Sequence, residues 1–178
     1  MKASVRFFIG AAAAALMSFS AICASAQTNA LPGESSQAAE TRAEKIRADC
    51  IQGRRLICGK ILKVLPEGLV VESGYTDLQR PALESSWLIA GNVSSHRSSD
   101  LVESAVPGSP CIGTVFLTDL PRLKRGSPRP KAFDYVVLLG YPAGQHTYNS
   151  VGSVQKTVRC FSATLAKAVA VNYKTSSN

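Results

Sequence analysis

The feature that most constrains the fold is a pair of short aliphatic runs joined by a tight turn. Residues 56–65 (LICGKILKVL) and 69–72 (LVVE) are rich in branched and aliphatic side chains. Pro66-Glu67-Gly68 separates them, with a proline that fixes φ and a glycine that tolerates positive φ. This pattern predicts a β-hairpin in which Gly68 supplies the positive φ.

Further short runs of the same character follow along the chain. Turn residues recur at intervals of about 8–12 residues, which is typical of antiparallel barrels and sandwiches. Long helices do not alternate with these runs, so a doubly wound α/β fold is disfavoured. One turn, at residues 141–144 (YPAG), is expected to separate two neighbouring strands. The additional strands are predicted at residues 87–90, 112–119, 135–140, 145–151 and 154–161.

Apolar residues at helical spacing lie at both ends of this β region. The N-terminal set, within a predicted helix over residues 37–50, is Ala39, Ala43, Ile46 and Cys50; the C-terminal set is Phe161, Leu165, Ala168 and Val169. The chain is therefore expected to be mainly β: a small antiparallel β-barrel with short N-terminal and C-terminal helices. Its outline of a hairpin, a long connection and further strands resembles an OB-fold or an SH3-like barrel. The resemblance is one of pattern and assigns no site residue.

The N-terminus has the three parts of a cleavable export signal. Lys2 and Arg6 form a positive region, residues 7–19 are apolar, and Ala24-Ser25-Ala26 predicts cleavage before Gln27. The apolar stretch is shorter than the roughly 20 residues that span a bilayer, which disfavours a membrane anchor. A lipoprotein site at Cys23 is disfavoured by the bulky residue before it. The protein is expected to be bacterial and exported, and to be periplasmic or secreted after cleavage.

This signal divides the chain. Residues 1–26 are the expected signal peptide, 27–36 a flexible leader, 37–173 a single mainly β domain, and 174–178 a frayed tail. The formal charge of the whole chain is +8. All acidic residues lie beyond residue 26, so the domain remains basic after cleavage.

Four cysteines survive cleavage: Cys50, Cys58, Cys111 and Cys160. An even number in an exported chain predicts two disulfides. Cys50 with Cys58 and Cys111 with Cys160 is one pairing, and the other two connectivities stay open. Buried free thiols are the alternative. Metal binding is not expected, because the chain has no C-x-x-C motif.

Several common chemistries lack their motifs. The chain has no G-x-S-x-G elbow and no nucleotide-binding glycine loop, and no cofactor is expected. A hydrolase would have to use His146 or His96, and a half-exposed strand position explains His146 without catalysis. Asp119 and Asp134 end or begin aliphatic strands, where local backbone hydrogen bonds explain them better than a carboxylate pair. Glu103 is expected on the solvated surface.

A basic segment stands out between two predicted strands. Residues 122–131 (RLKRGSPRPK) carry five cations and no acid, and their Gly and Pro residues predict a protruding loop. Such a loop attracts anionic groups, although a solvated loop is the simpler explanation. Aromatic residues that include Phe133 follow it, and exposed aromatics beside cations would form a stacking platform. The candidate binding residues are Arg122, Lys124, Arg125, Arg129, Lys131, Tyr141 and Tyr148.

The sequence therefore favours a non-enzymatic binding module of the cell envelope with an anionic or glycan partner. A docking or structural domain for another envelope protein is the alternative, and a hydrolase that depends on His146 is a weaker one.

Overall fold

The computed structural model describes residues 35–78, 88–89, 95–97, 99–121, 129–150, 152 and 154–177. The expected signal peptide, with Cys23, and three of the predicted binding residues, Arg122, Lys124 and Arg125, lie outside the described residues. The described chain is mainly β with two helices, as predicted. Its elements are α1 (Ser36–Gln52), β1 (Arg55–Leu65), β2 (Gly68–Ser73), the short 3-10 helix η1 (Thr76–Leu78), β3 (Leu88–Ile89), β4 (Gly113–Thr118), β5 (Tyr135–Asn149), β6 (Gln155–Ser162) and α2 (Leu165–Thr175).

The predicted hairpin is present, but its glycine has a different role. β1 and β2 pair antiparallel, with Leu65 opposite Gly68 across the turn. Gly68 is absent from the glycines with positive φ. A Cβ atom at this position would lie 2.2 Å from the main-chain oxygen of Leu117. Gly68 is therefore required because β4 approaches the backbone of β2 closely.

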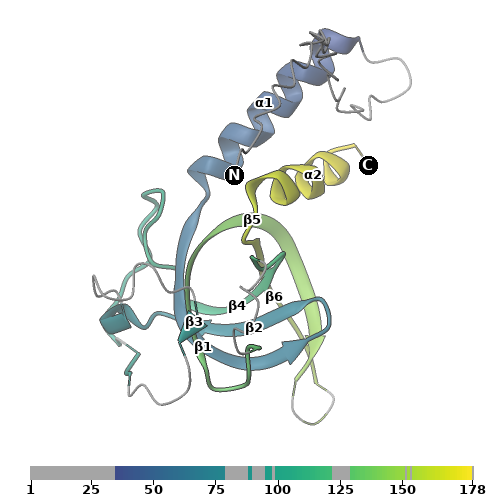
Figure 1. Cartoon of the computed structure of the whole chain (residues 1–178). Coiled ribbons are helices and arrows are strands. Elements are labelled where there is room, and N and C mark those ends of the chain that lie inside the picture. The colour runs from purple at the N-terminus through teal and green to yellow at the C-terminus, as the bar shows by residue number, and fades with distance from the viewer. Residues whose placement is uncertain are drawn as a thin grey trace, which may run out of the picture.

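Five of the strands form a closed ring (Figure 1). The order is β1-β2-β4-β6-β5, and β5 returns to pair with β1, while β3 adds to the start of β5. β4 and β6 are parallel, with Val115 opposite Arg159. The expectation of a purely antiparallel sheet was wrong at this junction. Strand direction cannot alternate all the way around a ring with an odd number of strands, so one neighbouring pair has to be parallel.

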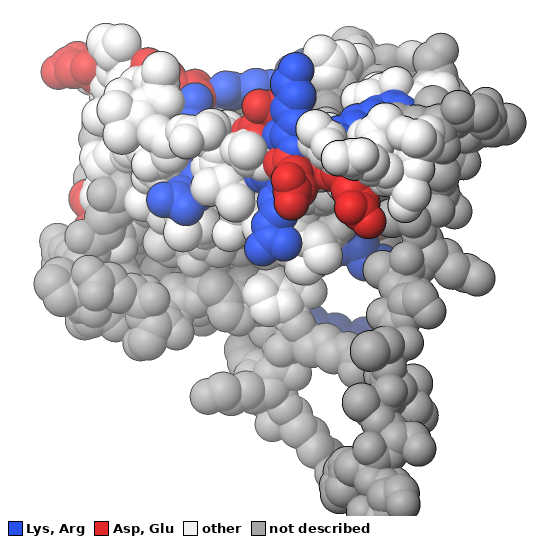
Figure 2. All heavy atoms as spheres, turned by 90° about the horizontal axis from the view of Figure 1, so that it is seen from above, with Lys and Arg blue, Asp and Glu red and all other residues white. Residues whose placement is uncertain are grey.

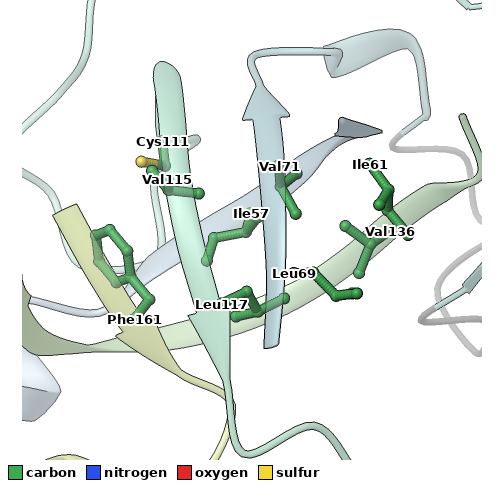
Figure 3. Close-up of a cluster of buried hydrophobic side chains, with 9 residues drawn as sticks. All are labelled: Ile57, Ile61, Leu69, Val71, Cys111, Val115, Leu117, Val136 and Phe161. Atoms are coloured by element: carbon green, nitrogen blue, oxygen red, sulfur yellow. The ribbon is translucent and has the colours of Figure 1, made fainter. Parts of the chain in front are cut away.

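The interior of the ring is filled by aliphatic and aromatic side chains (Figure 3). Strand alternation sends Leu69 and Val71 inward and Val70 outward. Burial of each such side chain contributes about 1.5–3 kcal/mol. The interior cluster consists of Ile57, Ile61, Leu69, Val71, Cys111, Val115, Leu117, Val136 and Phe161.

β5 is one long strand where the sequence predicts two. Its first part pairs with β1 and its second part with β6, and the register shifts between Pro142 and Gln145. Gly144 has φ +85° at this shift. The residues expected to form a turn therefore form a bulge, which bends β5 from one side of the ring to the other.

The two helices lie at one end of the ring (Figure 1). α2 packs on β5, and the Asn172 side-chain amide donates to the main-chain oxygen of Pro142 at 2.8 Å. α1 packs on α2, and its N-terminal part projects away from the ring. Phe161, expected on the C-terminal helix, belongs to β6 instead. α2 continues past Lys174, the residue from which fraying is expected.

The predicted disulfides are not formed. Cys50, Cys58, Cys111 and Cys160 are buried free thiols in the described structure. Cys111 lies in the interior cluster, Cys58 packs with η1 residues, and Cys160 lies on the outside of the ring. Cys50 contacts Asn172 where α1 meets α2. The expectation was wrong because each thiol is packed in a different part of the molecule.

Candidate functional site

The predicted binding residues that the structure describes do not share one surface. Tyr141 lies opposite Ser162, close to the start of α2, whereas Tyr148 lies opposite Lys156. The two tyrosines are seven positions apart on β5, roughly 23 Å along the strand at the usual rise per residue. Lys131 is exposed on the segment before β5. Of these residues, Tyr148 lies beside a pocket, so the candidate site is described from Tyr148 outward.

Tyr148 belongs to a second apolar layer on the outside of the ring. Val70 and Phe116 point outward from β2 and β4, and the His146 ring stacks on Phe116 with centroids 3.7 Å apart and planes at 10°. This outer layer consists of Val70, Phe116, Ala143 and Cys160, with Leu65, Tyr148 and Val158 packed against it.

The outer layer is covered by a two-stranded ribbon, formed by residues 145–149 of β5 and 155–159 of β6. β6 pairs with β4 from Arg159 onward, so the earlier part of the ribbon leaves the sheet. Lys63 Nζ donates to the main-chain oxygen of Asn149 at 2.9 Å and ties the ribbon to β1. The ribbon therefore folds back over β2 and β4.

A pocket of about 380 Å³ lies between this ribbon and the β1–β2 hairpin. Its walls are Leu62, Lys63, Val70, Tyr148 and Ser150. These residues include an aromatic, two aliphatics, a serine and a lysine, and the lysine ammonium can form hydrogen bonds beyond the one to Asn149. An anionic group at Lys63 would place its attached ring or chain against Tyr148. We call this space the ribbon pocket.

Arg129 lines a different pocket, of about 340 Å³, beneath the β1–β2 turn. Among its described lining residues, Glu67 and Asp119 are acidic and Arg129 is basic. Asp119 accepts a 2.8 Å hydrogen bond from the hydroxyl of Ser162. As the described residues line the two pockets, the ribbon pocket has a cation without a carboxylate beside it and is the better match for an anionic ligand.

The groups considered for hydrolysis have structural partners. Asp134 accepts from the main-chain N–H of Lys131 at 2.9 Å, and the His146 ring is stacked as described. Burial raises the pKa of Cys58 to about 12 and the pKa values of Cys111 and Cys160 to about 11. These thiols therefore remain protonated near neutral pH, which opposes nucleophilic attack.

One charged cluster was missed by the sequence analysis. Glu103, expected to be solvated, accepts from Arg159 at 2.7 and 2.9 Å, and Arg55 lies 3.7 Å away. Arg159 also donates to the main-chain oxygen of Ile112 at 2.7 Å. Glu103 and Arg159 are 56 residues apart, so no local sequence pattern predicts that they pair.

Charges of both signs lie side by side on the face seen from above (Figure 2). The described residues contain no group of three or more His, Cys, Asp or Glu side chains placed to hold a metal ion. Among the described helices, none has the length and apolar character needed to cross a membrane. No protein-family model, curated protein or solved structure matches the chain.

Proposed function

We propose that this protein is a non-enzymatic binding domain that takes an anionic ligand, with an acidic glycan as the leading class, in the ribbon pocket. It acts in the periplasm or outside the cell, after removal of residues 1–26. The observation that carries the proposal is that Lys63, Tyr148 and the exposed aliphatic residue Leu62 line one pocket. An acidic sugar offers a carboxylate or sulfate for the lysine and a ring face for the tyrosine.

We further propose that the ring is an OB-like barrel. With the ring strands β1, β2, β4, β5 and β6 numbered in chain order, their spatial order is 1-2-3-5-4, with the parallel pair between the third and fifth. This is the order of an OB-fold, and it favours that fold over the SH3-like alternative.

The position of the ribbon pocket agrees with this assignment. OB-folds bind oligosaccharides and oligonucleotides on the outer face of their second and third strands, between two loops. Val70 lies on the second strand of the ring, and Ser150 follows the fourth. The pocket therefore lies beside the second strand and the loop after the fourth, two of the parts that form this binding face, while no residue of the third strand, β4, is among its described lining residues.

The test is isothermal titration of the full mature chain with a heparin-derived oligosaccharide and with a neutral dextran oligosaccharide. We expect binding to the sulfated ligand that weakens with salt, because the Lys63 contact is screened. Lys63→Gln and Tyr148→Ala should each lower the affinity for the sulfated ligand about tenfold, which corresponds to the loss of one polar or one stacking contact. Lys167→Gln, on an exposed position of α2, is the matched charge control.

Tyr141→Ala tests whether the pocket or the sequence pattern identifies the binding residues, because the sequence predicts Tyr141 as one and it does not line the pocket. It should leave the affinity unchanged. Equal losses in Lys63→Gln and Lys167→Gln would remove the pocket from the proposal, and so would equal binding of both oligosaccharides. Salt-insensitive binding to a protein partner would favour the envelope docking domain instead.

A further inference from the structure

Phe133 is a large aromatic side chain held out from the protein surface. It lies on the segment just before β5 and is 62% exposed. Its φ is +75°, in the left-handed region that bulky residues rarely adopt. The ring packs into none of the three buried clusters of the described chain.

The fold uses the backbone of Phe133 but not its ring. The Phe133 N–H donates to the main-chain oxygen of Ile61 at 2.8 Å, and the Ile61 N–H donates to the oxygen of Asp134 at 2.8 Å. Glycine at position 133 would make the first of these bonds at a positive φ without strain. Among the described residues, the other non-glycine residue with positive φ is Asp119, which differs because its short side chain is hydrogen-bonded to Ser162. The presence of an exposed phenyl ring at such a position calls for a role outside the fold.

One cation lies against this ring, and two more are close to it in sequence. Lys60 Nζ lies 5.0 Å from the ring centroid. Lys131 and Arg129 are exposed on the same short segment, two and four residues before it. Asp134 is half-buried, and its carboxylate accepts from the main-chain N–H of Lys131. That bond does not involve the Lys131 ammonium group, so it does not neutralise its charge.

We propose that Phe133, with Lys60 and Lys131, docks the protein onto a bilayer that contains anionic lipid. The phenyl ring has no polar tip, so it suits the boundary between headgroups and acyl chains. The ammonium groups lie on flexible stems that reach back to the lipid phosphates, and each adds attraction to an anionic surface. This docking point is separate from the ribbon pocket, so it does not depend on the proposed ligand.

The experiment is vesicle flotation of the full mature chain. Vesicles of phosphatidylcholine alone are compared with vesicles that also contain phosphatidylglycerol. We expect the protein to float with the anionic vesicles and to be released by salt. Phe133→Gly should lower the partition coefficient about tenfold or more, the factor that loss of one buried phenyl ring implies. Lys60→Gln and Lys131→Gln should each lower it and reduce its dependence on salt.

The controls separate docking from misfolding. Glycine suits the backbone of Phe133, so Phe133→Gly should have a melting temperature at least equal to that of the wild type. Val154→Gly removes another exposed apolar side chain, 57% exposed, and should leave flotation unchanged. Phe133→Gly should also keep its affinity for the sulfated oligosaccharide.

Three results would overturn the inference. The first is equal flotation of Phe133→Gly and wild type, and the second is equal binding to neutral and anionic vesicles or to neither. The third is a Phe133→Gly defect limited to the soluble oligosaccharide, which would assign the ring to a glycan site. The first two results leave the predictions for Lys63 and Tyr148 untouched, and after the third the Lys63→Gln and Tyr148→Ala titrations still decide the ribbon pocket, so the two proposals fail separately.

Discussion

Glu103 shows how a single carboxylate holds distant parts of this chain together. It accepts two hydrogen bonds from Arg159 on β6, and its Oε2 lies 3.4 Å from the Ile112 N–H that precedes β4. Hydrogen bonding and the positive charge of Arg159 hold the pKa of Glu103 below its ordinary value of 4.5. The folded state therefore binds this proton more weakly than the unfolded chain does.

This shift predicts a stability contribution with a defined pH window. A depressed pKa stabilises the fold above pH 4.5 and loses that effect as the pH falls through the folded value. Glu103→Gln should lower the free energy of unfolding by about 1 kcal/mol at pH 7, a figure kept small because Arg159 is partly exposed. Urea unfolding at pH 7 and pH 3 measures it, and the difference between variant and wild type should shrink at the lower pH. Glu67→Gln, in the exposed turn, should change little at either pH, and a pH-independent Glu103→Gln defect would contradict the explanation.

At the scale of elements, the β1–β2 hairpin and β5 illustrate what glycine does here. The Gly68 backbone lies against β4, whereas Gly144 has open space around it and a φ of +85°. The first position is limited by its neighbours and the second by its own backbone conformation. A strand pattern read locally does not separate these two requirements.

Substitution to alanine distinguishes the two glycines. Gly68→Ala places a Cβ against the main-chain oxygen of Leu117, which cannot move aside as a flexible side chain could. The free energy of unfolding should therefore fall by about 3 kcal/mol. Gly144→Ala meets no atom and should cost about 1 kcal/mol from its left-handed backbone alone. Guanidinium unfolding of both variants measures the difference. Equal costs would show that β4 lies farther from Gly68 than in this structure.

Local sequence pattern predicts most of the helices and strands of this protein but misses one feature of β5. The hairpin, both helices and the strands at β4 and β6 follow from residue type and spacing. The bulge in β5 does not, because Pro142 and Gly144 suit a turn and a bulge equally well. Pairing with β1 on one side and β6 on the other keeps the strand continuous, and β1 is distant in sequence, whereas β6 is the next strand.

For the whole molecule, ring closure distributes the four thiols among separate packed regions. Cys111 is inside the ring, Cys160 outside it, Cys58 beside η1 and Cys50 between the helices. Burial raises the pKa of each of these thiols. No two of them lie close enough to form a disulfide. Their stability contribution comes from packing and not from cross-links.

This arrangement predicts how the protein reacts with thiol reagents. The mature chain, purified without reductant, should resist alkylation by iodoacetamide at pH 8 and accept four labels in denaturant, counted by mass spectrometry. The protection follows from the buried, protonated state of each thiol. The unfolding midpoint should be the same with and without reductant. Fewer than four labels in denaturant would restore the disulfide prediction.

The ribbon pocket was partly accessible from sequence. Aromatic clustering pointed to Tyr148, whereas nothing near Lys63 or Val70 marks them as its neighbours. Lys63 and Asn149 lie 86 residues apart, and the ribbon has to fold back before they meet. The basic loop was singled out by its charge, yet of its two described cations Arg129 lines the other pocket and Lys131 is exposed on the segment before β5.

The amino-acid sequence by itself determined the β character of this protein, its hairpin and its two terminal helices, because propensity and alternation act over a few neighbouring residues. The closed ring, its parallel pair, the separated thiols and the ribbon pocket were decided by the tertiary structure. Each depends on contacts between strands far apart in the chain, and such contacts are chosen by how all the strands pack together.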